Sequence, residues 1–207
     1  MSVGLLVVGF GDLFHTAAAQ FARQQPARRI EKLEIPWTEA EDLDTALLDP
    51  YAAEEWSVFA ATGMEGMNFV RLGLFSLGKQ RGFGGESFIH SSAVVDPSAS
   101  IGQNCYVGEN AVIGPESRLD YNVVIGARSV LGSGARLGSS AWIGANGILG
   151  AGSRVGSHTI IGAGVMVAQG ITVGRFCELQ IARNYRHDVP DRTFHHELFD
   201  QPVRIYA

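Results

Sequence analysis

Six histidines are the first candidates for proton transfer, because imidazole titrates near neutral pH and can act as a general base. They are His15, His90, His158, His187, His195 and His196. His90 lies where two compositional halves of the chain meet, which favours a structural role. His195 and His196 lie in an irregular tail, where they could reach a neighbouring molecule or simply form part of the surface. No local motif singles out one of the six as a base.

The two cysteines could act as nucleophiles, but their positions favour packing. Cys105 and Cys177 both fall on a small, inward-facing position of a six-residue repeat. A thiol buried there behaves as a small apolar side chain. Two cysteines are also too few for a disulfide framework or a cysteine-based zinc site, and they fit a reducing compartment.

The stretch GLLVVGFGD near the N-terminus ends in Gly9-Phe10-Gly11, followed by Asp12. It predicts a strand, a tight turn and the start of a helix, and it contains a fragment of the dinucleotide-binding fingerprint. Backbone N–H groups at the helix start could hold an anion, although Asp12 would come close to a phosphate there. Three interpretations stay open: NAD binding, binding of a nucleotide sugar or another small substrate, and a purely structural turn.

A six-residue repeat predicts the element that carries most of the other candidates. Counting by six from Ile89 to Leu179, every position is aliphatic, and glycine follows most of them. One hexad cannot bury its own aliphatic side chain, but stacked coils form a continuous apolar column. The repeat predicts a parallel β-helix over residues 87–181, with residues 182–207 as a C-terminal tail or cap.

Residues 1–86 predict a small βαβ domain instead. Its predicted strands lie in GLLVVGFGD, KLEIP and WSVFAAT, and its predicted helices are LFHTAAAQFARQ and GMNFVRLGLFSLGKQRGF. The second helix ends in a cationic turn followed by glycine, a typical helix stop.

Composition narrows the functional classes. The formal net charge is −5 and no cluster of Lys and Arg stands out, which argues against a nucleic-acid partner. No run of about 18 apolar residues is present, so we expect no membrane span. The N-terminus lacks the basic region of a signal peptide, so we expect a cytoplasmic protein.

Both halves together resemble the NeuD/PglD-like sugar acyltransferases of the hexapeptide-repeat class. The resemblance rests on FIHSSAVVDPSASIG at the junction, on GMNFVRLGLFSLGKQRGF, and on IIGAGVMVAQGITVG and HDVP near the end of the repeat. It implies an α/β, Rossmann-like N-terminal subdomain that binds a sugar nucleotide, followed by a left-handed β-helix. It also implies a homotrimer, with acetyl-CoA or another acyl-CoA as co-substrate in a groove between subunits.

The resemblance also locates a catalytic base, and histidine is missing there. The base position and the positions of further family histidines match five residues of this chain: Ser133, Arg136, Ser139, Ser140 and Trp142. Ser133 takes the place of the base, and its acidic neighbour is replaced by Gly132. Ser133 has no base in the local sequence, so a Ser–His mechanism has no support. Serines cannot supply the imidazole ligands of a γ-class carbonic anhydrase zinc site, so we expect no metal.

The remaining site residues follow from the same resemblance. For the sugar substrate we expect contacts from Gly9, Gly11, Asp12, Met67 and Asn68. For the acyl-CoA we expect contacts from Gly150, Ala151 and Ala163.

Three functions stay open. The first is an acyl-CoA-dependent N- or O-acyltransferase with a non-standard site, in which positioning of the reactants does much of the work. It would act on a sugar or nucleotide-linked sugar in glycan or secondary-metabolite biosynthesis. The second is a non-catalytic binding or scaffold homologue. The third is a different reaction in the same groove, with Arg136 and Trp142 binding an anionic or aromatic substrate.

Overall fold

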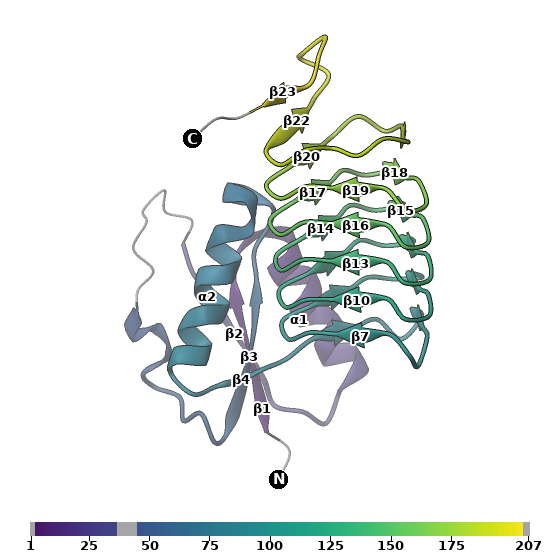
Figure 1. Ribbon diagram of the computed structural model, residues 1–207. Helices are drawn as coiled ribbons and strands as arrows, with labels where there is room; N and C mark the ends of the chain where they lie inside the picture. Colours follow the sequence, from purple (N-terminus) through teal and green to yellow (C-terminus); the bar gives the residue numbers. More distant parts are fainter. Residues whose placement is uncertain (1–2, 37–44, 205–207) are drawn as a thin grey trace. The chain divides into compact units, whose positions relative to one another are not determined.

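The computed structural model of the chain describes residues 3–36 and 45–204. The chain divides into two compact units, residues 1–88 and 89–207 (Figure 1). Residues 1–2 and 37–44 of the predicted N-terminal domain, and residues 205–207 of the predicted tail, lie outside the described residues. No helix within the described ranges has the length and apolar character that a membrane crossing requires.

The first unit contains a parallel four-stranded sheet in the order β2–β1–β3–β4. Its strands are β1 (Gly4–Gly9), β2 (Ile30–Glu34), β3 (Trp56–Ala61) and β4 (Gly84–Gly85). Every residue of β1 and β3 is buried, because helices cover both faces of the sheet. This burial explains why both strands are continuous apolar runs rather than alternating ones.

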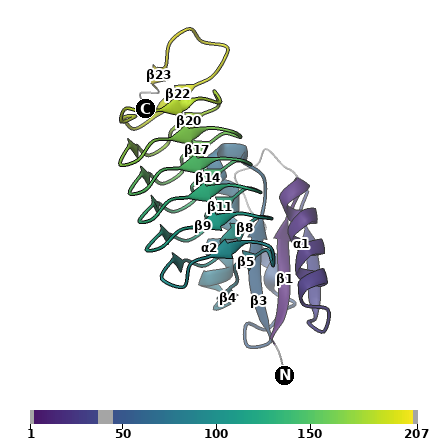
Figure 2. The same cartoon turned by 90° about the vertical axis from the view of Figure 1, so that its right-hand side faces the viewer.

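The helices α1 (Gly11–Gln24) and α2 (Phe69–Gln80) lie on opposite faces of this sheet (Figures 1 and 2). Phe21 of α1 packs edge-on against Phe59 of β3, and Leu74 of α2 packs in a cluster with Val58 from the other face of that strand. Two short 3-10 helices, η1 (Thr45–Leu48) and η2 (Glu65–Asn68), complete the unit.

The helix predicted from Gly66 begins only at Phe69. Gly66, Met67 and Asn68 have φ values of 56°, 51° and 66°, so three consecutive residues are left-handed. A left-handed conformation costs about 1–2 kcal/mol for each non-glycine residue, so surrounding contacts must hold this turn in place.

The second unit is a left-handed β-helix with three flat faces, as the six-residue repeat and the resemblance predict (Figure 2). One short strand recurs in each hexad, and each pairs in parallel with the strand three hexads further along the chain, as Leu119 does with Leu137. In the two-residue strands from Val94 to Tyr185, the first residue points outward and the second points into the prism, as Arg118 and Leu119 do.

We name each face by residues that point outward from it. The arginine face consists of β7 (Ser100–Ile101), β10 (Arg118–Leu119), β13 (Arg136–Leu137), β16 (Arg154–Val155) and β19 (Thr172–Val173). The valine face consists of β6 (Val94–Val95), β9 (Val112–Ile113), β12 (Val130–Leu131), β15 (Ile148–Leu149), β18 (Met166–Val167) and β21 (Asn184–Tyr185). The tryptophan face, which carries Trp142, consists of β5 (Phe88–Ile89), β8 (Tyr106–Val107), β11 (Val124–Ile125), β14 (Trp142–Ile143), β17 (Ile160–Ile161), β20 (Glu178–Leu179), β22 (Thr193–His195) and β23 (Val203–Arg204).

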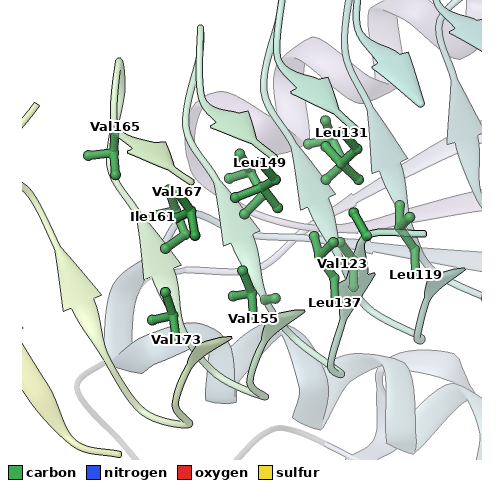
Figure 3. Packing of buried hydrophobic residues seen from close by; sticks show 14 of the residues in the cluster. Leu119, Val123, Leu131, Leu137, Leu149, Val155, Ile161, Val165, Val167 and Val173 are labelled. Carbon is green, nitrogen blue, oxygen red and sulfur yellow. The ribbon is translucent and has the colours of Figure 1, made fainter. Parts of the chain in front are cut away.

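The inward residues form one apolar core along the prism (Figure 3). Leu119, Leu137, Val155 and Val173 lie one above the other behind the arginine face. Each is at most 3% exposed. Cys105 and Cys177 are fully buried in the same core, which confirms that they are packing residues.

The regular coil continues beyond the last aliphatic hexad. Tyr185 takes the next inward position with 5% of its surface exposed, and Val189 forms a bridge to Val173. The chain then adds β22 beside β20, and β23 pairs with β22 in antiparallel fashion. Aromatic and polar residues thus close the C-terminal end of the column.

Candidate functional site

The first unit offers a crevice where the strand order reverses. The chain leaves β1 toward β2 on one side, while β3 lies on the other side of β1. In open α/β sheets, ligands bind outside the carboxyl ends of the strands at such a point. β1 and β3 end together there, and the Phe10 N–H donates to the Ala61 carbonyl over 3.1 Å.

Gly9 and Gly11 shape this edge in different ways. A Cβ atom on Gly9 would lie 1.7 Å from the Ala61 oxygen, so only glycine permits this close approach. Gly11 has a φ of +74° and open space around its Cα, which leaves room for a ligand. Asp12 is exposed in the first turn of α1, where the helix dipole favours its negative charge.

Met67 and Asn68 belong to the segment that follows β3, so they lie at the same edge as Gly9 and Gly11. Asn68 is fully buried and both residues are part of the left-handed turn. Backbone strain of this kind is concentrated at ligand-binding and catalytic sites. The structure therefore places all five predicted substrate residues on the two segments that leave β1 and β3 at the switch point.

Ser133 lies in the turn between β12 and β13, at the corner where the valine face meets the arginine face. Its side chain is exposed, and its carbonyl accepts a hydrogen bond from the Gly152 N–H over 2.8 Å. Gly150 and Ala151 therefore occupy the same corner one coil further along. Ala163, the third residue predicted for acyl-CoA, lies in the turn between β17 and β18, where the tryptophan face meets the valine face.

The other predicted pocket positions do not converge within one chain. Arg136 points outward from the arginine face, and Trp142 points outward from the tryptophan face. Ser139 and Ser140 lie in the turn between them. Ser139 donates to the Ser157 hydroxyl over 3.2 Å, and the buried Ser140 hydroxyl accepts from the Asn122 amide over 2.8 Å. Ser140 therefore supports the coil and is not accessible to a substrate.

No described histidine of the β-helix lies on the Ser133 coil, although His187 follows β21 at the same valine–arginine corner three coils further along. His158 lies in the turn between β16 and β17, a different corner, as counting three hexads per coil predicts. It is 7% exposed and stacks on Phe176 with ring centroids 5.4 Å apart. In the part of the chain that the structure describes, the adjacent coils place Pro115 and Ala151 at the positions equivalent to Ser133, and neither side chain can act as a base.

His195 is part of a polar cluster in the C-terminal cap. Its Nδ1 lies 2.9 Å from the Arg183 guanidinium, which can only donate, so Nδ1 accepts and the proton resides on Nε2. Burial and the Arg183 charge lower the pKa of His195, which favours the neutral ring. His195 and Arg183 line a cavity of about 590 Å³, together with Tyr185, His187 and Arg204.

The sequence interpretation overlooked Arg118 and Arg154. With Arg136, they line a cavity of about 470 Å³ on the arginine face. The signal was present in the sequence as arginine recurring at every third hexad, always at the outward position. Among the described residues, no group of three or more His, Cys, Asp or Glu side chains is placed to hold a metal ion.

The comparisons with known proteins agree with this architecture. The sequence model of the family named GMPPB C-terminal domain matches residues 83–181. A search of curated proteins gives no match. The acetyltransferase domain of PglB from Neisseria gonorrhoeae is 23% identical, with a TM-score of 0.81 over 93% of this chain and 96% of that chain. One structure of that domain contains acetyl coenzyme A.

PerB from Caulobacter crescentus was solved in complex with CoA and GDP-perosamine, and it is described as a GDP-perosamine N-acetyltransferase. It is 24% identical to this chain, with a TM-score of 0.78 over 92% of each chain. Over nearly its whole length, the chain therefore has the fold of these hexapeptide-repeat sugar acetyltransferases, as the resemblance predicts.

Proposed function

We propose that the chain is an acyl-CoA-dependent acyltransferase that acts on a nucleotide-linked sugar. The observation that carries the proposal is the order of its two units. An α/β unit with a switch-point crevice precedes a left-handed β-helix, as in neighbours whose structures hold acetyl coenzyme A, or CoA with GDP-perosamine. Its two buried, unbridged thiols favour the cytoplasm as the location of this activity.

The crevice of the first unit would bind the acceptor. Gly9 lets β1 and β3 approach closely, Gly11 leaves space beside the start of α1, and the exposed Asp12 carboxylate accepts hydrogen bonds but repels phosphate. Asp12 therefore suits hydroxyl groups of a sugar or ribose rather than the diphosphate. Met67 and Asn68 would bound the same crevice from the segment after β3.

The β-helix would present the acyl donor at the Ser133 corner, beside Gly150 and Ala151. There the acceptor nitrogen or oxygen bonds to the thioester carbonyl carbon, the carbon–sulfur bond breaks with coenzyme A leaving as its thiolate, and the acceptor proton passes to solvent. Ser133 can position an acceptor through its hydroxyl but has no imidazole beside it to remove a proton. An amine acceptor that reacts in its neutral form needs the least help from a base, so we favour N-acyl transfer.

We further propose a homotrimer that packs through the valine face. Its outward side chains form an apolar stripe: Val94, Val112, Val130, Ile148 and Met166 are each 37–63% exposed. A contiguous exposed apolar patch typically marks an interface between proteins. Replacing Val130 and Ile148 together with Lys should dissociate the trimer in light-scattering measurements. Ser100→Lys, on the arginine face, is the matched control and should leave the mass unchanged.

The activity is tested by incubating the protein with acetyl-CoA and a panel of nucleotide-linked amino sugars while measuring thiol release. Cys105 and Cys177 are fully buried, so the protein contributes little background. Asp12→Ala should raise the KM for the sugar nucleotide by about tenfold, the value of a hydrogen bond to a charged group. Glu54→Ala, also exposed in the first unit, should not. The absence of thiol release with every acceptor would contradict the proposal and favour a non-catalytic binding homologue.

A further inference from the structure

Three arginines form a regular row on the arginine face. Arg118 pairs with Arg136, and Arg136 pairs with Arg154, at equivalent positions of neighbouring parallel strands. Adjacent strands lie about 4.8 Å apart, so the three side chains leave the sheet one directly above another. All three are exposed.

This row is electrostatically unfavourable in the absence of a ligand. Like charges directly opposite on adjacent strands destabilise a sheet. Within residues 3–36 and 45–204, none of the three guanidinium groups has a hydrogen bond or an ion pair to another residue. The chain carries 16 Lys and Arg against 21 Asp and Glu, so an excess of positive charge does not explain the cluster.

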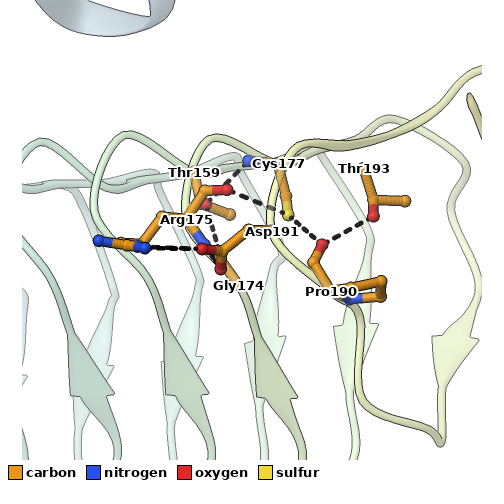
Figure 4. Close-up of polar contacts among 7 residues, drawn as sticks. All are labelled: Thr159, Gly174, Arg175, Cys177, Pro190, Asp191 and Thr193. Carbon is orange, nitrogen blue, oxygen red and sulfur yellow. Dashed lines mark hydrogen bonds and ion pairs between the residues drawn. The ribbon is translucent and has the colours of Figure 1, made fainter. Parts of the chain in front are cut away.

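The carboxylates near the row leave it uncompensated. Asp191 lines the same cavity but accepts hydrogen bonds from the Arg175 backbone N–H and guanidinium, at 2.8 and 2.9 Å (Figure 4). Asp120 lines the opposite end of the cavity, near Arg118. The part of the row between Arg136 and Arg154 is therefore the most strongly positive part.

The cavity in front of the row has the size of a small-molecule site. It measures about 470 Å³, and its floor contains Leu137, Val155 and the glycines that follow them. Ligand pockets typically span about 300–1,000 Å³. A Cβ on Gly138 would lie 2.7 Å from the Ser157 nitrogen, and one on Gly156 would lie 2.6 Å from the Arg175 nitrogen, so these glycines allow the coils to stack closely.

We propose that the arginine face binds a ligand with two or more linked phosphate groups, placed along the β-helix axis in front of Arg136 and Arg154. A guanidinium donates two parallel hydrogen bonds to phosphate oxygens, and a row of them matches a chain of anions better than a single anion. Asp120 repels a phosphate at the Arg118 end, so Arg118 makes the weaker contribution. Coenzyme A and a nucleoside diphosphate both supply this chemistry, and binding here does not depend on acyl transfer.

The repulsion within the row gives the proposal a second, independent readout. Removing the middle charge relieves two repulsive contacts, so Arg136→Gln should raise the melting temperature of the free protein while weakening ligand binding. Added salt screens like charges, so it should stabilise the wild type more than Arg136→Gln. If Arg136 were purely structural, Arg136→Gln would lower the melting temperature instead, because the loss of the arginine would destabilise the protein.

The test is calorimetric titration of the full chain with inorganic pyrophosphate, coenzyme A and GDP. Pyrophosphate should bind, and Arg136→Gln and Arg154→Gln should each weaken it about tenfold, the typical value of a charge-assisted hydrogen bond. Arg128→Gln is the matched control, since Arg128 is exposed at a different corner of the same β-helix. The row belongs to the acyl donor if coenzyme A competes with pyrophosphate, and to the sugar nucleotide if GDP competes.

Two outcomes would overturn the proposal. One is a failure of site-specific binding, seen either as no pyrophosphate binding by the wild type or as an equal loss in Arg128→Gln. The other is dissociation of the oligomer in Arg136→Gln, which would mean that the row pairs with carboxylates of a second copy. Neither outcome depends on thiol release, so a failure of this site remains distinguishable from a failure of the proposed transferase activity.

Discussion

The side-chain amide of Asn122 donates a hydrogen bond to the Ser140 hydroxyl over 2.8 Å, across one coil of the β-helix. One coil earlier, Asn104 donates to the Asn122 side-chain oxygen over 2.7 Å. All three residues are fully buried and have left-handed φ values. They form a polar ladder at one corner of the prism, which makes Ser140 a structural residue although its type suggests chemistry.

Ser140→Ala should lower the free energy of unfolding by about 1–3 kcal/mol, because it removes the acceptor of a buried hydrogen bond. Ser133→Ala, at an exposed turn in the same β-helix, should change it by less than about 0.5 kcal/mol. Urea denaturation of both variants checks this difference. Equal effects would show that the ladder contributes nothing to stability.

Two glycines in the Ser133 turn should respond differently to alanine. A Cβ on Gly132 would lie 2.6 Å from the Ala151 nitrogen and 2.9 Å from its Cα, so Gly132→Ala must push two coils apart. We expect a loss of about 3 kcal/mol or more. Gly134 has a φ of +69° and no atom within 4 Å of the added Cβ, so Gly134→Ala should cost only about 1 kcal/mol of backbone strain. Thermal unfolding distinguishes the two, and a larger effect at Gly134 would refute the steric argument.

His195 should make the stability of the cap depend on pH. Burial and the Arg183 charge lower its pKa in the folded state, so the unfolded chain binds the proton more readily. Stability is therefore fully present above about pH 6.5, the unfolded pKa, and is lost as the pH falls through the lower folded value. His195→Gln, which keeps an acceptor for Arg183, should flatten the change in melting temperature between pH 7.5 and about 5.5. His187→Gln, at an exposed position, serves as the control and should leave the slope unchanged.

The contact between Arg175 and Asp191 should make a second contribution to stability that is also lost on acidification, but at a lower pH. Hydrogen bonds from the Arg175 backbone and side chain lower the pKa of the Asp191 carboxyl. Its contribution is present above about pH 3.9, the unfolded pKa, and disappears as the pH falls through the lower folded pKa. Both side chains are largely exposed, so Asp191→Asn should cost only about 0.5 kcal/mol at pH 7. Urea titrations at neutral pH and well below the folded pKa should show this difference vanishing, and a constant difference would count against it.

The proposed transferase should lack the pH signature of a histidine base. With no imidazole at this corner on the Ser133 coil or on the two coils next to it, kcat/KM for an amine acceptor should rise with pH as the amine loses its proton. The profile should show no inflection at about 6.5, the ordinary pKa of histidine. Rate measurements on wild type and His158→Asn check this expectation. An inflection near that pH that the variant abolishes would identify His158 as a base.

The repeat made the β-helix predictable, because the aliphatic hexads and the following glycines leave only one way to stack the coils. The same counting placed His158 and Ser133 on different corners. The predicted start of α2 was wrong, because Met67 and Asn68 adopt left-handed backbone conformations that residues other than glycine rarely adopt. The end of the prism extends further than the hexads indicate, since Tyr185 fills an inward position that the repeat reserves for aliphatic residues.

The site was harder to predict than the fold. Ser133 and Ser140 look alike in sequence, and only the Asn122 contact shows that one is buried and structural. Arg136 and Trp142 lie one hexad apart, yet a corner separates the faces from which they point. Conversely, Arg118 and Arg154 are separated by two full coils of sequence and flank the same residue in space. Closeness in the sequence is therefore a poor guide to which residues meet at a site that spans several coils.

The constant spacing of three hexads between paired strands also has a kinetic consequence. Every coil finds its partner within a short stretch of chain, so the entropy of loop closure is the same modest amount at each step. Folding of the prism can therefore nucleate at any pair of adjacent coils and propagate coil by coil in both directions. During synthesis, each further coil that leaves the ribosome can be added to the growing end without waiting for the C-terminus.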